Sequence, residues 1–203
     1  GRPDLQQSIA FHCTRVNNPT KDDQKKLART IKYLMATVHL PLILSMNKHG
    51  ISEWWMDTSF AVHDDMRSQT GTMFSLGKGT IYCASTKQKI VTSSSTEAEL
   101  VGVADVMPKI LWCRHFMESQ GCVVEEVYVC QDNQSAILLE TNGRASVGKG
   151  TRHVKIKYFF VTDKVKDKEL KILYCPTKEM IGDFYTKPLQ GMLFKEHRNS
   201  ILG

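Results

Sequence analysis

The sequence predicts an α/β domain in which a mixed five-stranded sheet carries helices on both faces. Three observations lead to this fold class. Hydrophobic and polar residues follow a strand period in segments 52–61, 71–76 and 80–84, which indicates an antiparallel meander. Segment 127–131 is mostly apolar, as suits a strand that is buried on both faces. Apolar residues at helical spacing separate and follow these strands, and such an order of elements is typical of a mixed sheet between helices.

Caps and breakers place the helices. Ser94, Ser95 and Thr96 supply capping hydroxyls for a long helix that runs towards a stop at Gln120-Gly121. Pro108 lies inside this helix, so we expect a kink or a break near Met107. The remaining expected elements are, in order, a helix over 133–141, a glycine-bearing loop over 142–150, a helix over 154–165, a strand over 170–174 and a last helix that starts near Lys178.

Residues 1–46 read as a short helical extension, and residues 47–203 as the main domain. A first helix over 6–15 is expected, and Thr20 can cap a second helix in which apolar residues recur at helical spacing. A short apolar strand over 42–46 then leads into the domain.

Composition excludes several classes of protein. The 203 residues are 41% hydrophobic, which is ordinary for a soluble globular chain, and no apolar run approaches the roughly 18 residues of a membrane span. We therefore expect no membrane partner, and the first residues lack the order of a signal peptide. The six cysteines form no CxxC pair and the seven histidines no HExxH motif, so a disulfide framework or a histidine-bound metal is not expected.

Basic residues point to a polyanionic partner. The net charge is +6, and lysines and arginines are concentrated in segment 149–171. Arg152, Lys155 and Lys157 are the candidate phosphate contacts, because basic side chains that neutralise phosphates release counterions. A solvated basic face with no partner is the alternative.

Four acids stand where they can meet at one edge of the sheet. Asp57 lies in the first strand, Asp132 follows the buried strand, Glu99 lies in the long helix and Asp183 in the last one. A charged carboxylate beside a buried strand is costly unless a cation or hydrogen bond meets it. Carboxylates suit Mg²⁺ or Mn²⁺, and two such ions about 4 Å apart can activate a water for phosphodiester hydrolysis.

These acids also have ordinary explanations. Asp132 could be only the N-cap of the following helix, and Asp57 and Asp183 could be solvated acids. Glu97 and Glu99 cannot both face the sheet, because residues two apart on a helix point about 200° away from each other. Glu99 lies closer to the apolar stripe of its helix, so we predict that it is the ligand and that Glu97 is solvated.

Three motifs carry a resemblance to a known family. They are SSTEAEL at 94–100, CQDNQSA at 130–136 and YCPTKEMIGD at 174–183, and they are extended by RPDL at 2–5, TRHVKI at 151–156 and TKPL at 186–189. In these segments the chain resembles the ribonuclease H domain of copia-type retrotransposon polyproteins, and the resemblance covers nearly the whole sequence. It implies a ribonuclease H-like fold, with residues 1–46 as the thumb-like or connection-like tail of the polymerase.

The resemblance also implies an activity and its residues. The expected activity is endonucleolytic cleavage of the RNA strand of an RNA–DNA hybrid with two Mg²⁺ ions, for which Mn²⁺ can substitute. Asp57 and Asp132 would touch the ions most directly, Glu99 would complete one site and orient the water near the scissile phosphate, and Asp183 would support the other ion. The expected substrate contacts are Ser95, Asn133, Gln134, Arg152, Lys155, Lys157 and Lys178.

One departure concerns the loop before the last acid. Many relatives carry a histidine there, whereas this chain has Lys178, which could act at the leaving group or only contact phosphate or solvent. Asn133 and Ser95 could equally serve as local helix caps.

The expected partners are the hybrid and the reverse transcriptase polymerase domain of the same polyprotein, in a cytoplasmic virus-like particle or in the nucleus. A non-catalytic ribonuclease H-like module that grips hybrid and positions a polymerase is the main alternative function. A transposase or integrase core is a further alternative, disfavoured by the helix motif and the fourth acid.

Overall fold

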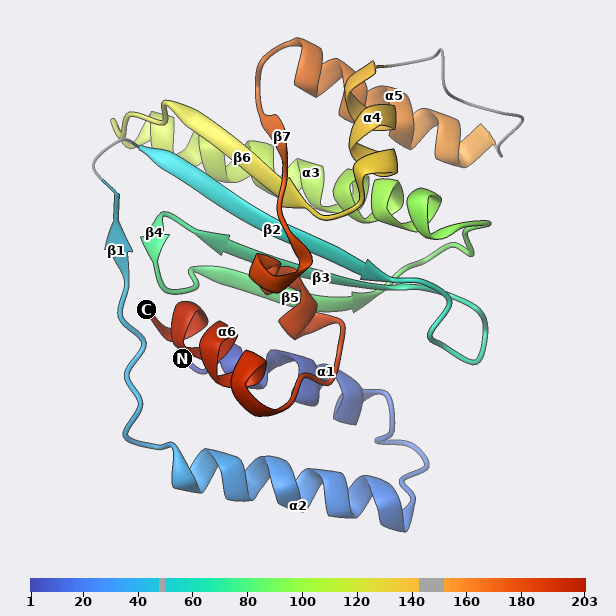
Figure 1. The fold of residues 1–203 in the computed structure, drawn as a ribbon, viewed down its shortest axis with the longest axis vertical. Coiled ribbons are helices and arrows are strands. Elements are labelled where there is room, and N and C mark those ends of the chain that lie inside the picture. Colours follow the sequence, from blue (N-terminus) through green and yellow to red (C-terminus); the bar gives the residue numbers. More distant parts are fainter. Residues whose placement is uncertain (48–49, 143–151) are drawn as a thin grey trace.

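The sheet has five strands in the order β5-β3-β2-β6-β7 (Figure 1). The computed structural model describes residues 1–47, 50–142 and 152–203. The strands are β2 (Ile51–Ser59), β3 (Gln69–Ser75), β5 (Tyr82–Lys87), β6 (Glu126–Gln131) and β7 (Lys171–Tyr174). The first three pair antiparallel, and β6 and β7 run parallel to β2. This order and these directions confirm the mixed sheet and the ribonuclease H-like fold that the sequence predicts.

Helices cover both faces of this sheet (Figure 1). One face carries α3 (Ser95–Ser119), α4 (Gln134–Asn142) and α5 (Arg152–Lys166), and the other carries α1 (Gln6–Cys13) and α6 (Gly191–Leu202). The glycine-bearing loop expected at 142–150 falls, apart from Asn142, outside the described residues.

Alternation along β2 separates two cores. Trp54 and Met56 are fully buried on the α3 side, where the Trp54 ring stacks on Phe74 with the ring centroids 4.4 Å apart. Trp55 instead packs on the other face, against a second cluster that contains Tyr185. A strand that is buried on both faces therefore runs through the middle of the molecule, and its ends are fixed by packing from two sides.

The long helix confirms its predicted cap but not its predicted break. Ser94 accepts a hydrogen bond from the backbone N–H of Glu97, and Gly121 lies at φ +78° just beyond the helix end. The helix nevertheless runs from Ser95 to Ser119 through Pro108 without a break. Pro108 lies on the exposed side of the helix, while buried residues on both sides of it, such as Val103 and Ile110, hold the two halves against the sheet. Packing offsets the single missing hydrogen bond.

The prediction of a last helix that starts near Lys178 is wrong. Two short 3-10 turns, η3 (Thr177–Glu179) and η4 (Ile181–Tyr185), come first, and α6 begins only at Gly191. Close approach explains the difference, because a Cβ atom on Gly182 would lie 2.9 Å from the backbone nitrogen of Asp57. Only glycine allows the chain to come this near to β2.

The N-terminal extension packs on the second face of the sheet. α2 (Lys21–Ala36) begins with the predicted cap, since Thr20 and Asp23 form a reciprocal capping box. The expected strand over 42–46 is reduced to β1 (Ser45–Met46), which pairs with β4 (Gly77–Lys78). Among the described residues, no helix is long and apolar enough to cross a bilayer.

One buried acid was not anticipated. Glu140, on α4, is fully buried, and among the described residues no hydrogen bond of good geometry reaches its carboxyl oxygens, although the Gln131 side chain lies beside them. Burial raises the pKa of Glu140 to about 8. A protonated, neutral carboxyl is therefore the form that the fold accommodates at neutral pH.

Replacing Glu140 tests this directly. The folded chain holds the Glu140 proton more tightly than the unfolded chain, so between the ordinary pKa of 4.5 and about 8 the folded state binds more protons. Stability is therefore lost as the pH rises through this window, by at most about 1.4 kcal/mol per pH unit. We expect Glu140→Gln to remove this part of the pH dependence and to be more stable than wild type at pH 8.

The measurement is urea unfolding of both proteins at pH 5, 6.5 and 8, with the exposed Glu125→Gln as the matched control. A Glu140→Gln variant that parallels wild type at all three pH values would show that the carboxyl is not held protonated.

Candidate metal centre

Three carboxylates gather at one end of the sheet. Ligand oxygens of Asp57, Glu99 and Asp132 all lie within 4.8 Å of one another, and this is the one such group of His, Cys, Asp or Glu side chains found in the described part of the chain. Asp57 and Glu99 are buried, at 3% and 5% exposure, and Asp132 is half-buried. We refer to these three residues as the triad.

Strand register brings the triad together. β2 and β6 run parallel with Trp55 opposite Cys130, so Asp57 and Asp132 each lie two residues further toward the same edge of the sheet. Glu99 arrives from α3, and the backbone N–H of Thr58 donates to its Oε1 at 3.1 Å. The sheet and the capped helix together fix all three side chains.

Asp183 joins the triad from the opposite layer. It is buried in η4, and the ammonium of Lys187 links it to Asp57 of the triad. The Lys187 ammonium donates to Asp183 Oδ1 at 2.7 Å and lies 3.5 Å from Asp57 Oδ1. The hydroxyl of Thr186 also donates to Asp57 Oδ2. All four acids that the sequence singles out therefore lie in one neighbourhood.

The four acids carry more negative charge than the single ammonium of Lys187 can balance. Burial, and then the charges of Asp57 and Asp132, raise the pKa of Glu99 well above its usual value. Burial and the nearby Asp57 charge raise the pKa of Asp183 to about 6. A bound cation would relieve this repulsion and restore the charged forms. Clustered carboxylate oxygens fit a hard divalent ion such as Mg²⁺ or Mn²⁺.

The two neighbouring glutamates have different surroundings. The carboxylate of Glu97 accepts hydrogen bonds from the backbone N–H and the hydroxyl of Ser93, both at 2.5 Å, at the exposed start of α3. Glu99 instead is buried, and its carboxylate lies beside those of Asp57 and Asp132. The helix phase expected from the sequence is the one that the structure has.

Asp132 is not the cap of α4. Asn133 takes that place, since its Oδ1 accepts from the backbone N–H of Ala136 at 3.1 Å. Asp132 Oδ2 accepts instead from the hydroxyl of Thr177 at 3.1 Å, which ties it to the loop before Asp183. The capping explanation of Asp132 is therefore excluded, whereas Asn133 does have the local role that was weighed for it.

The other expected substrate residues lie outside the triad. Ser95 and Gln134 are exposed in the first residues of their helices. Lys178 lies in η3, on the loop that leads to Asp183. Arg152 and Lys155 lie at the start of α5, where their side chains are outside the described part of the structure.

The basic segment is partly neutralised by the protein itself. Lys157 forms an ion pair with Asp105 of α3. Further along, the ammonium of Lys164 lies 2.9 Å from a carboxylate oxygen of Glu169. Net charge in this segment therefore overstates the charge that is free to meet a phosphate.

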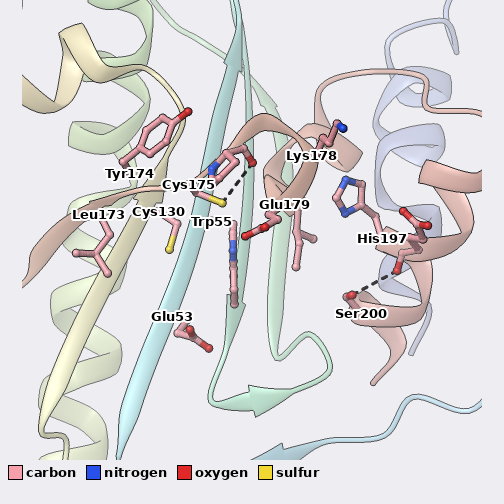
Figure 2. Close-up of a pocket in the computed structure, with 13 residues that line it drawn as sticks. Glu53, Trp55, Cys130, Leu173, Tyr174, Cys175, Lys178, Glu179, His197 and Ser200 are labelled. Carbon is pink, nitrogen blue, oxygen red and sulfur yellow. Dashed lines mark hydrogen bonds between the residues drawn. The ribbon is translucent and has the colours of Figure 1, made fainter.

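A cavity of about 500 Å³ lies between β7 and α6 (Figure 2). Lys178 lines it, but so do Glu53, Glu179 and Glu196, and no triad residue does. Three carboxylates repel a phosphate backbone, so this cavity is a poor path for nucleic acid. The candidate chemistry stays at the triad.

Sequence reasoning missed Thr177, Thr186 and Lys187. TKPL at 186–189 was noted as a motif without any role. The spacing of Asp183 and Lys187 offered a signal, because oppositely charged residues four apart in helical backbone are neighbours.

The chain is similar to retrovirus-related Pol polyproteins of plant transposons. It is 29% identical over 187 residues to the polyprotein of transposon TNT 1-94 from Nicotiana tabacum, which covers 92% of this chain and 14% of that protein. It is 28% identical to the polyprotein of transposon RE2 from Arabidopsis thaliana, over 98% of this chain and 14% of that protein. The chain thus spans about 14% of the length of these relatives, and the resemblance stated from its motifs is confirmed.

Other comparisons are more remote. A Ty1 Gag-Pol polyprotein of Saccharomyces cerevisiae is 27% identical over 68% of this chain and 8% of that protein. LC11-RNase H1, isolated from compost, is 14% identical over 64% of this chain and 86% of that chain, with a TM-score of 0.47. A TM-score below 0.5 carries no argument, and the strand order of the sheet is what supports the fold. No family model matches the chain.

The two glutamates of α3 provide a test of the ion site. We expect Glu99→Gln to weaken Mn²⁺ binding about tenfold or more, because an amide does not supply the anionic oxygen that a hard ion requires. Glu97→Gln is the matched control two residues away and should bind Mn²⁺ like wild type. Calorimetric titration of each folded variant measures this. Loss of binding in Glu97→Gln and its retention in Glu99→Gln would reverse the assignment.

Proposed function

We propose that this chain is a metal-dependent ribonuclease H, which hydrolyses the RNA strand of RNA–DNA hybrids as the nuclease part of a retrotransposon Pol polyprotein. The observation that carries the proposal is the buried triad of Asp57, Glu99 and Asp132 at one end of a ribonuclease H-like sheet, with Asp183 beside it. Similarity to Pol polyproteins over most of the chain supports the retrotransposon setting.

The proposed reaction uses two divalent ions. When bound, Mg²⁺ or Mn²⁺ supplies the Lewis acidity that activates a water and stabilises the leaving 3′-oxygen. Asp57 and Asp132 would hold the ions, Asp57 because it lies between Asp183 and the other two acids of the triad. Glu99 would complete one site and orient the attacking water, and Asp183 would support the second ion. Attack on phosphorus then leaves a 3′-hydroxyl and a 5′-phosphate.

Preorganisation is the contribution of the protein. Asp57 is held by Thr186, Glu99 by the backbone of Thr58, and Asp132 by Thr177. Carboxylates that are already in place need no rearrangement when ions and substrate arrive, and this lowers the barrier.

Hybrid recognition would come from around the triad. Lysines and arginines of α5, with Lys178, would contact backbone phosphates, and Ser95, Asn133 and Gln134 would reach the minor groove or a 2′-hydroxyl. Asn133 uses its carbonyl oxygen as a cap, which leaves its amide N–H groups to donate.

The same polyprotein would supply the polymerase partner. We assign residues 1–46 to the end of the polymerase and residues 47–203 to the nuclease, and we place the protein in a cytoplasmic virus-like particle, with the nucleus as the alternative location.

Asp132→Asn tests the proposed chemistry. We expect this substitution to abolish Mg²⁺-dependent cleavage of a labelled hybrid, because the remaining acids cannot hold an ion in the attacking geometry. The fold should persist, since Asp132 is half-buried and its neighbour Thr177 can bond an amide equally well.

The assay is initial cleavage rate at saturating Mg²⁺, with circular dichroism as the check of folding. Wild-type turnover in folded Asp132→Asn would refute the metal-ion assignment. Hybrid binding by wild type without any cleavage would select the non-catalytic module instead.

Salt dependence tests the basic segment. Neutralising Lys155 and Lys157 together should weaken hybrid binding for all sequences alike and lower the slope of log K against log salt by about 0.9 per lost contact. Because Lys157 is paired with Asp105, we expect a loss nearer one contact than two.

Lys25 and Lys32, exposed on α2 at the far side of the molecule from α5 (Figure 1), form the matched control pair. Their neutralisation should leave the slope as it is in wild type. Equal slopes in all three proteins would remove α5 from the hybrid interface.

A further inference from the structure

Lys187 is the one cation recorded in contact with the four acids within the described residues. Its ammonium bridges Asp183 Oδ1, at 2.7 Å, and Asp57 Oδ1, at 3.5 Å. The two acids are almost fully buried, whereas the Lys187 side chain is 41% exposed. A flexible positive charge thus enters from solvent and ends between two fixed negative ones.

Asp57 belongs to two groups of oxygens. With Glu99 and Asp132 it forms the triad, which can hold one ion. With Asp183 it forms a pair, and that pair is bridged by Lys187 rather than left open. A second hard ion would seek the same two oxygens that the ammonium now contacts, so the ion and Lys187 compete for one place.

We propose that Lys187 is a positioning residue that occupies the second ion position and gives it up when a divalent ion binds there. This inference rests on the proposed function, since it presumes that divalent ions bind at these acids. Before the ion binds, the ammonium reduces the electrostatic repulsion between the carboxylates of Asp57 and Asp183.

The surrounding contacts allow such an exchange. The backbone N–H of Lys187 bonds to the carbonyl oxygen of Asp183 at 2.9 Å, and Thr186 holds Asp57 Oδ2. These bonds do not involve the ammonium, so the backbone and both acids keep their anchors when it leaves. The four-carbon stem of lysine, already partly in solvent, can swing the charge outward toward a phosphate.

The proposal predicts how removal of the Lys187 charge changes the affinity for each divalent ion. A lysine that only lay near the acids would, when removed, raise the affinity for the first and the second ion to a similar degree. A lysine that competes with an ion would, when removed, raise the affinity for that ion. Loss of a unit charge a few ångströms away corresponds to an effect of about tenfold or more.

The experiment is Mn²⁺ titration of the ion-free chain by calorimetry, with bound ions counted by electron paramagnetic resonance. We expect Lys187→Met to bind the second ion about tenfold more tightly than wild type, with the first ion little changed. We also expect the ion-free variant to unfold at lower temperature. Lys195→Met, exposed on α6, removes the same charge elsewhere, and Lys187→Arg keeps it in place; both should bind ions like wild type.

Each result has a defined meaning. A second ion that binds only in Lys187→Met would also support the competition. Second-ion affinity that is unchanged or weaker in folded Lys187→Met, or a similar gain for both ions, would overturn it, while binding of an ion at the triad would leave the proposed nuclease standing. Wild type that binds no divalent ion at all would instead refute the proposed function itself.

Discussion

Mutual repulsion among buried carboxylates is the constraint on which the rest of the structure depends. Asp57, Glu99 and Asp183 are each about 95% buried or more, and their burial, together with the nearby negative charges, raises the pKa values of Glu99 and Asp183. Burying several carboxylates together costs free energy unless a cation or hydrogen bonds compensate their charge. Parallel β2 and β6, the capped start of α3 and the glycine approach of η4 together hold the acids against that repulsion.

The site draws its residues from both faces of the sheet. Glu99 comes from the α3 layer, whose core is built on Trp54 and Met107. Asp183 and Lys187 come from the opposite layer, whose core contains Phe184 and Tyr185. Asp57 stands on β2 between them. Because the oxygens must be fixed to within a fraction of an ångström for efficient chemistry, the packing of both layers bears on the site.

Sequence patterns predicted the parts of the fold that depend on local periodicity. Alternation identified β2, the apolar run identified β6, and the phase of α3 chose Glu99 over Glu97, since each depends on residues close in the chain. Pro108 misled because its exposed position in α3 is set by tertiary packing. The turns around Asp183 were missed for a similar reason: the shape of η4 depends on how near β2 lies, and only the fold reveals that distance.

Buried or paired charges whose neighbours come from distant segments could not be predicted from the sequence. Glu140 reads in the sequence as an ordinary helical acid, and its burial appears only when α4 packs on the sheet. Lys187 stands in the sequence only as part of the TKPL motif at 186–189, which by itself gives no sign of the acids that it contacts.

The N-terminal extension bears on the site through the same second layer. Asp4 is buried and bonded by both Arg2 and the hydroxyl of Tyr33, which ties the start of the chain to α2. α1 then packs against β5 and against η4, the turn that holds Asp183. Residues that the sequence assigns to a polymerase tail therefore support one wall of the proposed nuclease site. The tail thus packs nearest to Asp183 and Lys187, which come from the layer that it completes, whereas Glu99 is anchored by α3 and by the backbone of Thr58 on β2.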